Sequence, residues 1–181
     1  MPIEIEKKYR LTSGQRQQVE QRLRELGTVF EGEDFEENTL FAGEPLIGKN
    51  CALRLRRVGN RAILTFKERF PTTDSIKRQS EDETTVGDAD AMEAILKSLG
   101  FVPRLVYEKR RATWRWGEVE VVLDELPFGS FMEIEGTEDE ILDVERKLAI
   151  ADLEVEHRTY PQLANQLGVS RDSLIEARFK H

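Results

Sequence analysis

Charged side chains recur at every second position in several segments of this chain, and their types indicate phosphate chemistry. Arginine and lysine gathered in one place repel each other unless an anion lies between them. The guanidinium fork of arginine matches pairs of phosphate oxygens, and lysine adds a point charge. The cations that suit a polyphosphate in this way are Lys8, Arg54, Arg56, Lys67 and Arg111.

Carboxylates show the same two-residue spacing in other segments. The pairs are Glu4/Glu6, Glu81/Glu83 and Glu133/Glu135, with Glu120 and Asp124 in a further segment. The chain has one cysteine and two histidines, which excludes a cysteine cluster and a multi-histidine zinc site. Oxygen ligands of this kind suit Mg²⁺ or Mn²⁺. We therefore expect a cationic wall that holds phosphates, an acidic wall that holds a metal able to activate a water, and metal-dependent affinity for tripolyphosphate.

Taken singly, each alternating segment also fits an ordinary amphipathic strand whose charged face lies in water, because charged residues are mostly exposed. The pair Glu81/Glu83 fits this alternative best, since Ser80 and Asp82 make the whole segment polar. The alternative weakens when the segments are taken together, because solvent does not require repeated Glu-x-Glu and Arg-x-Arg pairs on separate strands. We therefore favour an enclosed, charged interior.

Alternation and turn residues predict the elements that position these side chains. Gly59-Asn60 suits a two-residue hairpin turn, and Thr12 and Asp88 suit helix N-caps. The predicted strands are 3–10, part of 29–41, 51–58, 61–70, 78–86, 104–116, 118–125 and 131–136. Two predicted helices begin after these N-caps. Three more are predicted at 138–148, 161–167 and 171–179.

These elements predict an α+β protein, an eight-stranded antiparallel closed β-barrel with helices packed outside. The helices cover the apolar strand faces with their own apolar stripes, which leaves the charged faces to line the interior. A barrel of this size can hold one small ligand. We divide the chain into a tunnel domain at 1–168 and a C-terminal helical tail at 169–181.

Length and composition limit the class of protein. The 181 residues fit a single domain, and the formal charge of −8 argues weakly against a nucleic-acid partner. The charge is segregated, because 117–157 holds 14 Asp/Glu against two Lys/Arg. No apolar run could span a bilayer, and the first residues lack the layout of a signal peptide. With the lone Cys51, these features indicate a cytoplasmic protein without a membrane partner.

The motifs together resemble the CYTH superfamily, also called triphosphate tunnel metalloenzymes. Glu4-Ile5-Glu6-Lys7-Lys8 matches the Glu-x-Glu-x-Lys signature of that family. The other matching segments, in the family's order, are Leu53-Arg54-Leu55-Arg56, Thr65-Phe66-Lys67, Glu81/Glu83, Lys109-Arg110-Arg111, Leu123-Asp124, Gly129-x-Phe131-x-Glu133-x-Glu135 and Thr159-Tyr160-x-x-Leu163. The resemblance covers about residues 3–163. It implies an eight-stranded tunnel that binds a triphosphate with Mg²⁺ or Mn²⁺.

The resemblance also implies roles for individual residues. Catalytic roles fall on Glu4, Glu6, Lys8, Glu133 and Glu135. The implied metal ligands are Glu4, Glu6, Glu83, Asp124, Glu133 and Glu135, with Glu81 as an alternative to Glu83. The implied phosphate contacts are Lys8, Arg54, Arg56, Lys67, Lys109 and Arg111.

The sequence departs from the family pattern before its Glu-x-Glu segment. The family often has an arginine two residues before the first glutamate, where this chain has Gln79, with Arg78 one step out of phase. This predicts either a β-bulge in that strand or the loss of the contact. Whether Arg78 or Glu81 faces the tunnel stays open at this point.

Three functions fit the resemblance, and we favour a divalent-metal-dependent hydrolase of triphosphates such as inorganic tripolyphosphate, thiamine triphosphate or a nucleoside triphosphate. A class IV adenylate cyclase, which makes cyclic AMP and pyrophosphate from ATP, stays open because no residue is evidently dedicated to a base or a ribose. A non-catalytic polyphosphate-binding module is the third, although a pure anion binder would not need the paired carboxylates. The expected partner is a small triphosphate, and a homodimer rests on the resemblance.

Overall fold

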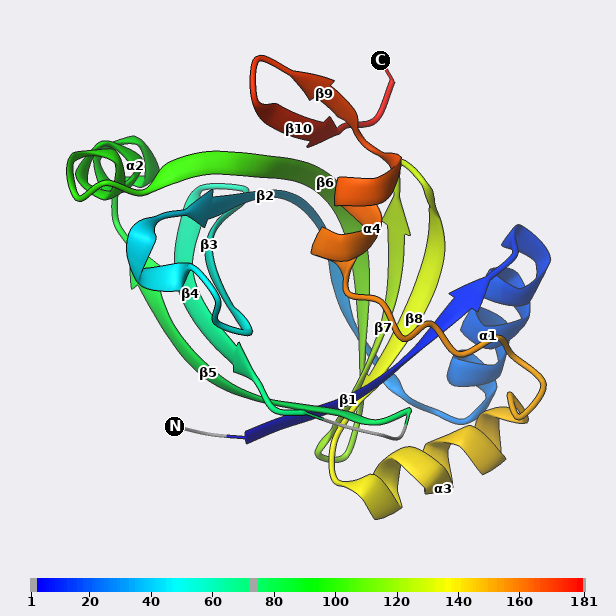
Figure 1. Cartoon of the computed structure of the whole chain (residues 1–181). Coiled ribbons are helices and arrows are strands. Elements are labelled where there is room, and N and C mark those ends of the chain that lie inside the picture. Colours follow the sequence, from blue (N-terminus) through cyan, green and yellow to red (C-terminus); the bar gives the residue numbers. More distant parts are fainter. Residues whose placement is uncertain (1–2, 72–74, 181) are drawn as a thin grey trace.

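Strands that alternate between apolar and charged positions build a closed barrel (Figure 1). The computed structural model describes residues 3–71 and 75–180, and within that range eight strands close the barrel. The strand order is β2-β3-β4-β5-β1-β8-β7-β6, each neighbouring pair is antiparallel, and β6 pairs back with β2. The barrel strands are β1 (Ile3–Leu11), β2 (Val29–Ala42), β3 (Cys51–Val58), β4 (Arg61–Arg69), β5 (Lys77–Val86), β6 (Val102–Trp116), β7 (Val119–Leu126) and β8 (Gly129–Glu135).

Tight turns set the register of the hairpins. Val58 lies opposite Arg61, so Gly59-Asn60 forms the two-residue turn that the sequence predicts, with Gly59 at φ +53°. Gly117, at φ +61°, opens the corresponding turn between β6 and β7. A positive φ matches the right-handed twist of the flanking strands and strains most residues other than glycine. These turns keep the charged positions of neighbouring strands on one face.

Two helices cover the outer face of one side of the barrel. α1 (Ser13–Glu25) and α3 (Glu138–Leu148) pack on β1 and β8 and against each other. Leu23, Ile141 and Ile134 are fully buried between the helices and the sheet. Burying each such side chain contributes roughly 1.5–3 kcal/mol, so the apolar strand faces turn outward, toward the helices.

Two further helices pack on other strands. α2 (Ala89–Ser98) packs on β3 and β4 through Leu96, and a short 3₁₀ helix, η1 (Glu44–Leu46), follows β2. α4 (Tyr160–Leu167) packs on β6 and β10 through Leu163 and lies over one end of the barrel (Figure 1). None of the helices in the described ranges is long and apolar enough to cross a membrane.

The charged strand faces point into the barrel, as the alternation predicts. Lys8 and Lys109 are each 2% exposed, and Asp124 is fully buried. Charged groups on an open, solvated sheet would not be covered in this way. The confirmed architecture is therefore the closed antiparallel barrel with helices outside.

The predicted helix at 171–179 is wrong, because this segment forms a β-hairpin. β9 (Val169–Arg171) and β10 (Leu174–Ala177) join through Asp172 and Ser173, both at positive φ. β10 pairs in parallel with the part of β6 around Leu105. β7 runs beside β6 only from residue 110 onward, which leaves the earlier backbone of β6 unpaired on that side. Satisfying those backbone groups favours a strand over a helix.

Candidate active site in the barrel tunnel

The barrel encloses a cavity of about 610 Å³, and its lining contains most of the residues to which the sequence assigns a role. The predicted residues in the lining are Glu4, Glu6, Lys8, Arg54, Arg56, Lys67, Glu83, Lys109, Arg111, Glu133 and Glu135. Asp124 is the exception, since it lies behind the lining. The fold therefore brings together side chains from β1, β3, β4, β5, β6 and β8.

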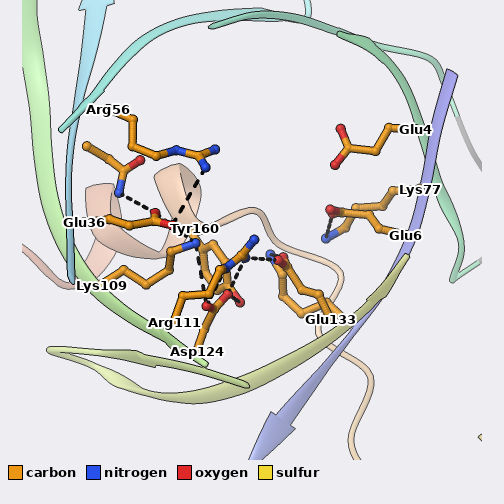
Figure 2. A network of polar contacts seen from close by, with 12 residues as sticks. Glu4, Glu6, Glu36, Arg56, Lys77, Lys109, Arg111, Asp124, Glu133 and Tyr160 are labelled. Carbon is orange, nitrogen blue, oxygen red and sulfur yellow. Dashed lines mark hydrogen bonds and ion pairs between the residues drawn. The ribbon is translucent and has the colours of Figure 1, made fainter. Parts of the chain in front are cut away.

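Seven residues in and behind the tunnel wall form a dense network of hydrogen bonds and ion pairs (Figure 2). We name this network the paired cluster: Lys8, Glu36, Lys109, Arg111, Asp124, Glu133 and Tyr160. Arg111 donates from Nε to Asp124 Oδ1 at 2.8 Å and from Nη2 to Asp124 Oδ2 at 2.6 Å. The same Nη2 donates to Glu133 Oε2 at 2.7 Å, and Lys8 Nζ lies 3.1 Å from Glu133 Oε1. The cluster thus joins β1, β2, β6, β7, β8 and the start of α4.

Burial and opposite charge compete within the paired cluster. Burial would lower the pKa of Arg111, but Asp124 and Glu133 outweigh it and hold the pKa well above its ordinary value. Burial would raise the pKa of Glu133, yet Lys8 and Arg111 hold it well below its ordinary value. At Lys109, burial and the neighbouring charge of Arg111 outweigh the carboxylates of Asp124 and Glu36 and lower the pKa to about 8. Most of these groups are charged because their partners are present.

Asp124, one of the metal ligands that the resemblance implies, lies behind the cavity lining. Its carboxylate is fully buried and accepts both bonds of the Arg111 fork. The hydroxyl of Tyr160 donates to Asp124 Oδ2 at 2.8 Å, and Lys109 Nζ lies 3.6 Å away. With its oxygens already engaged, Asp124 orients cations of the tunnel wall and does not face the cavity.

A second group of tunnel residues carries more carboxylates than cations, even though Lys77 Nζ lies 3.4 Å from Glu6 and Arg115 lies 2.7 Å from Glu120 (Figure 2 shows the Lys77 pair). We name this group the open cluster: Glu4, Glu6, Lys67, Glu81, Glu120 and Glu135. Lys67 Nζ lies 2.8 Å from Glu4 Oε2 and 2.5 Å from Glu81 Oε2. Burial and the adjacent Glu81 raise the pKa of Glu4. The side chain of Glu135 is solvent-exposed at its surface but surrounded by protein on its other sides. This desolvation, and then the charges of Glu4, Glu120 and Glu6, raise the pKa of Glu135 to about 7.

The open cluster fits a divalent cation. Burial and then neighbouring carboxylates raise the pKa of Glu4 and Glu135, and a bound cation would stabilise their charged forms. The donors are carboxylate oxygens, which suit Mg²⁺ or Mn²⁺. Within the described residues, no group of three Asp, Glu, His or Cys side chains is already arranged as a metal site. Lys67 occupies the place between Glu4 and Glu81, so a metal would have to displace its ammonium group.

Two predicted phosphate contacts have donor groups without a partner. In the described part of the chain, the buried Nε atoms of Arg54 and Arg56 have no hydrogen-bond partner. Arg56 lies 3.8 Å from Glu36, and Arg54 lies 3.9 Å from both Glu81 and Glu83. Burial and then the charge of Arg54 lower the pKa of Arg56. A buried donor without an acceptor costs free energy, which an anion in the tunnel would recover.

The departure at Gln79 has a clear structural outcome. The β4–β5 register runs without interruption from Ala62 opposite Val86 to Arg69 opposite Gln79, so this stretch holds no bulge. Gln79 faces the tunnel and donates from Nε2 to Glu4 Oε2 at 2.9 Å. Arg78 points outward and contacts Glu138 at 2.6 Å. Glu81 lines the tunnel, and Arg78 does not.

The sequence patterns gave no role to Glu36, behind the tunnel wall, or to Arg69 in its lining, and they placed Glu120 among the inward carboxylates without a specific role. Glu36 is 2% exposed and lies 3.1 Å from Lys109 Nζ. Acidic residues occupy both faces of β2, so alternation does not mark Glu36 as inward. Asn38, two residues later and also buried, donates to Glu36 at 3.3 Å and was a usable signal.

The chain belongs to the CYTH domain family, whose model matches residues 2–166. No curated protein matches it. Among solved structures, the PH1012 protein from Pyrococcus horikoshii OT3 is 26% identical, with a TM-score of 0.78, and the match covers 88% of this chain and 98% of that one.

Two further structures share the fold. HpAC1 from Hippeastrum, an adenylyl cyclase candidate described as having a dominant triphosphatase activity, is 19% identical with a TM-score of 0.71 over 92% of this chain and 96% of that one. An adenylate cyclase candidate from Vibrio parahaemolyticus is 22% identical with a TM-score of 0.70 over 90% of this chain and 98% of that one. The resemblance stated from the motifs is therefore confirmed at the level of family and fold.

Proposed function

We propose that this protein is a divalent-metal-dependent triphosphatase that hydrolyses triphosphate substrates inside the tunnel. The observation that supports the proposal is that one cavity holds both guanidinium donors without an acceptor and carboxylates with raised pKa values. Buried guanidinium donors at Arg54 and Arg56 need an anion, and crowded carboxylates at Glu4 and Glu135 need a cation. A triphosphate with a divalent metal answers both needs at once.

The residues of the chain would divide the work of binding. The guanidinium forks of Arg54 and Arg56 would hold non-bridging phosphate oxygens, while Lys8, Lys109 and Arg111, already paired with carboxylates, would add N–H donors on the opposite wall. The carboxylates of Glu4, Glu6, Glu81 and Glu135 would hold Mg²⁺ or Mn²⁺, which neutralises phosphate charge and polarises water when bound. A fixed array of charges needs little reorganisation as charge develops on the phosphates.

The reaction is the hydrolysis of a phosphoanhydride. A water oxygen forms a bond to the terminal phosphorus, and the bond from that phosphorus to the bridging oxygen breaks. The water proton leaves to solvent, so tripolyphosphate yields orthophosphate and pyrophosphate. Positioning and charge neutralisation supply most of the catalysis in such reactions.

Hydrolysis is favoured over cyclisation by the lining of the cavity. A cyclase must hold a base and a ribose as well as the phosphates. The lining tyrosines in the described residues present little ring surface: Tyr107 is 2% exposed in an apolar cluster, and Tyr160 donates to Asp124 while Lys8 Nζ lies 3.7 Å from its ring centroid. The dominant triphosphatase activity described for HpAC1 also supports the hydrolase.

One assay tests the proposal. The protein is incubated separately with tripolyphosphate, thiamine triphosphate and ATP, each with Mg²⁺, Mn²⁺ or EDTA, and the products are identified. We expect release of orthophosphate that depends on the metal. Cyclic AMP with pyrophosphate would establish the cyclase, and binding without turnover would establish a binding module.

A further inference from the structure

Arg69, at the end of β4, places its guanidinium in the tunnel wall without a carboxylate partner. Among the described residues, its buried Nε has no hydrogen-bond partner and its side chain makes no ion pair. Burial lowers the pKa of Arg69, although the charge of Glu6 opposes this. A half-buried cation whose buried Nε lacks an acceptor is costly to keep unless a ligand completes it.

The backbone register places Arg69 in line with the two arginines of β3. Arg69 N donates to Asn50 O at 2.8 Å, and Asn50 Nδ2 donates to Arg69 O at 3.0 Å, so these residues lie side by side. From Asn50, the inward positions continue through Ala52 to Arg54 and Arg56. We name Arg54, Arg56 and Arg69 the guanidinium row. The row follows about 20 Å of strand, and the small Ala52 leaves space between its members.

The neighbouring strand does not neutralise Arg69. Gln79 lies directly opposite Arg69 on β5, and its uncharged amide is used on Glu4 at 2.9 Å. Two residues along β4, Lys67 lies opposite Glu81 and contacts it at 2.5 Å. The open cluster therefore supplies a partner for Lys67 and none for Arg69.

We propose that Arg69 is a further phosphate-binding residue, and that it reads the length of the phosphate chain as the outermost member of the guanidinium row. This inference rests on the proposed function and specifies its ligand as a linear chain of at least three phosphates. A chain held at Arg54 and Arg56 comes nearer to the Arg69 fork with each phosphate added on the Ala52 side, so a longer chain engages Arg69 and a shorter one does not. The fork of Nε and Nη atoms would bind two oxygens of that phosphate.

The test measures binding in EDTA, so that it does not depend on turnover. Isothermal titration calorimetry is carried out with orthophosphate, pyrophosphate and tripolyphosphate on the wild type and on Arg69→Gln, Arg69→Lys and Arg104→Gln. Arg104, exposed on β6 and outside the cavity lining, is the matched control for loss of one charge. Arg69→Gln should weaken tripolyphosphate binding about tenfold or more and pyrophosphate binding less than about twofold. Arg69→Lys should lie between Arg69→Gln and the wild type, because it keeps the charge and loses the fork.

Each other result overturns a defined part of the inference. Equal tripolyphosphate affinity in Arg69→Gln and Arg104→Gln would remove Arg69 from the binding site. Equal losses for pyrophosphate and tripolyphosphate would overturn the reading of chain length. If the wild type binds tripolyphosphate and Arg69→Gln binds it equally well, this inference fails and the proposed function stands. If the wild type neither binds nor hydrolyses tripolyphosphate, the proposed function itself is contradicted. If Arg69→Gln does not fold, Arg69→Lys decides by the same comparison.

Discussion

The two clusters of the tunnel have similar residue types and differ in how fully their charges are compensated. In the paired cluster, buried cations face buried carboxylates, and Asp124 binds Arg111 through both oxygens. In the open cluster, carboxylates crowd each other, and burial together with Glu4 raises the pKa of Glu135 to about 7. A buried network whose charges are balanced holds its geometry. A network with an excess of one charge is stabilised when a ligand of opposite charge binds. We therefore expect the paired cluster to stabilise the fold and the open cluster to bind the ligand.

The largest expected effect comes from breaking the paired cluster. Asp124→Asn should lower the free energy of unfolding by about 3–5 kcal/mol, because it leaves Arg111 and Lys109 buried with too little opposing charge. Urea unfolding measures the loss. The control is Glu125→Gln on the same strand, where an exposed ion pair with Arg110 predicts a loss below about 1 kcal/mol. Equal losses in the two variants would show that the paired cluster does not support the fold.

A change in the open cluster should reverse this pattern of stability and activity. Glu4→Gln should reduce metal-dependent turnover by about 100-fold or more, because it removes a carboxylate proposed to hold the metal. Its thermal midpoint should stay the same or rise, since the charged form of Glu4 is disfavoured where it lies. Steady-state phosphate release and thermal unfolding are measured together, with Glu118→Gln, in the exposed β6–β7 turn, as the control. A destabilised Glu4→Gln with normal turnover would contradict the division between the clusters.

The guanidinium row should affect binding and leave stability largely unchanged. Arg56→Gln should weaken tripolyphosphate binding about tenfold or more, because a charge-assisted hydrogen bond is lost. Arg57→Gln is the adjacent control, since Arg57 points outward and contacts Asp90 at 2.6 Å. Calorimetry distinguishes them, and equal affinities would mean that Arg56 does not contact the anion.

The smallest effect is a pH dependence of stability with opposite signs in two places. Glu156 accepts from Arg158, at 2.7 Å, and from Arg10, and hydrogen bonding from Arg158 is the main cause that lowers its pKa to about 2. This pairing should stabilise the fold above pH 4.5, and as pH falls from 4.5 toward 2 the stabilisation should be lost, by no more than about 2 kcal/mol. Glu135 in metal-free protein should act oppositely, because its raised pKa favours the fold at low pH and that contribution is lost as pH rises from 4.5 through 7.

Unfolding in EDTA at pH 3–8 measures both contributions. Glu156→Gln should flatten the slope below pH 4.5, and Glu135→Gln should flatten the slope between pH 4.5 and 7. A Glu135→Gln variant with the wild-type slope would show that the open cluster does not crowd its carboxylates in solution.

Most of the barrel could be predicted because each strand carries its own period. The alternation at Glu4, Glu6 and Lys8 marks one face of β1 whatever the rest of the chain does. Gly59-Asn60 and the helix N-caps are similarly local signals. The C-terminal hairpin could not be predicted this way, because β10 forms on an edge of β6 that is open only where β7 ends. Without that edge, the periodicity of 171–179 fits a helix equally well.

For the site too, the sequence determines some features and the tertiary structure determines others. Residue types and spacing by themselves determined that the tunnel holds inward cations and carboxylates suited to phosphates and a hard metal. Only the tertiary structure decided which charges compensate each other. Glu36 reaches Lys109 and Arg56 because β2 closes the barrel on β6 and also pairs with β3. The physical reason is that a period of two fixes the face of each side chain locally, whereas its partner depends on register between strands far apart in the chain.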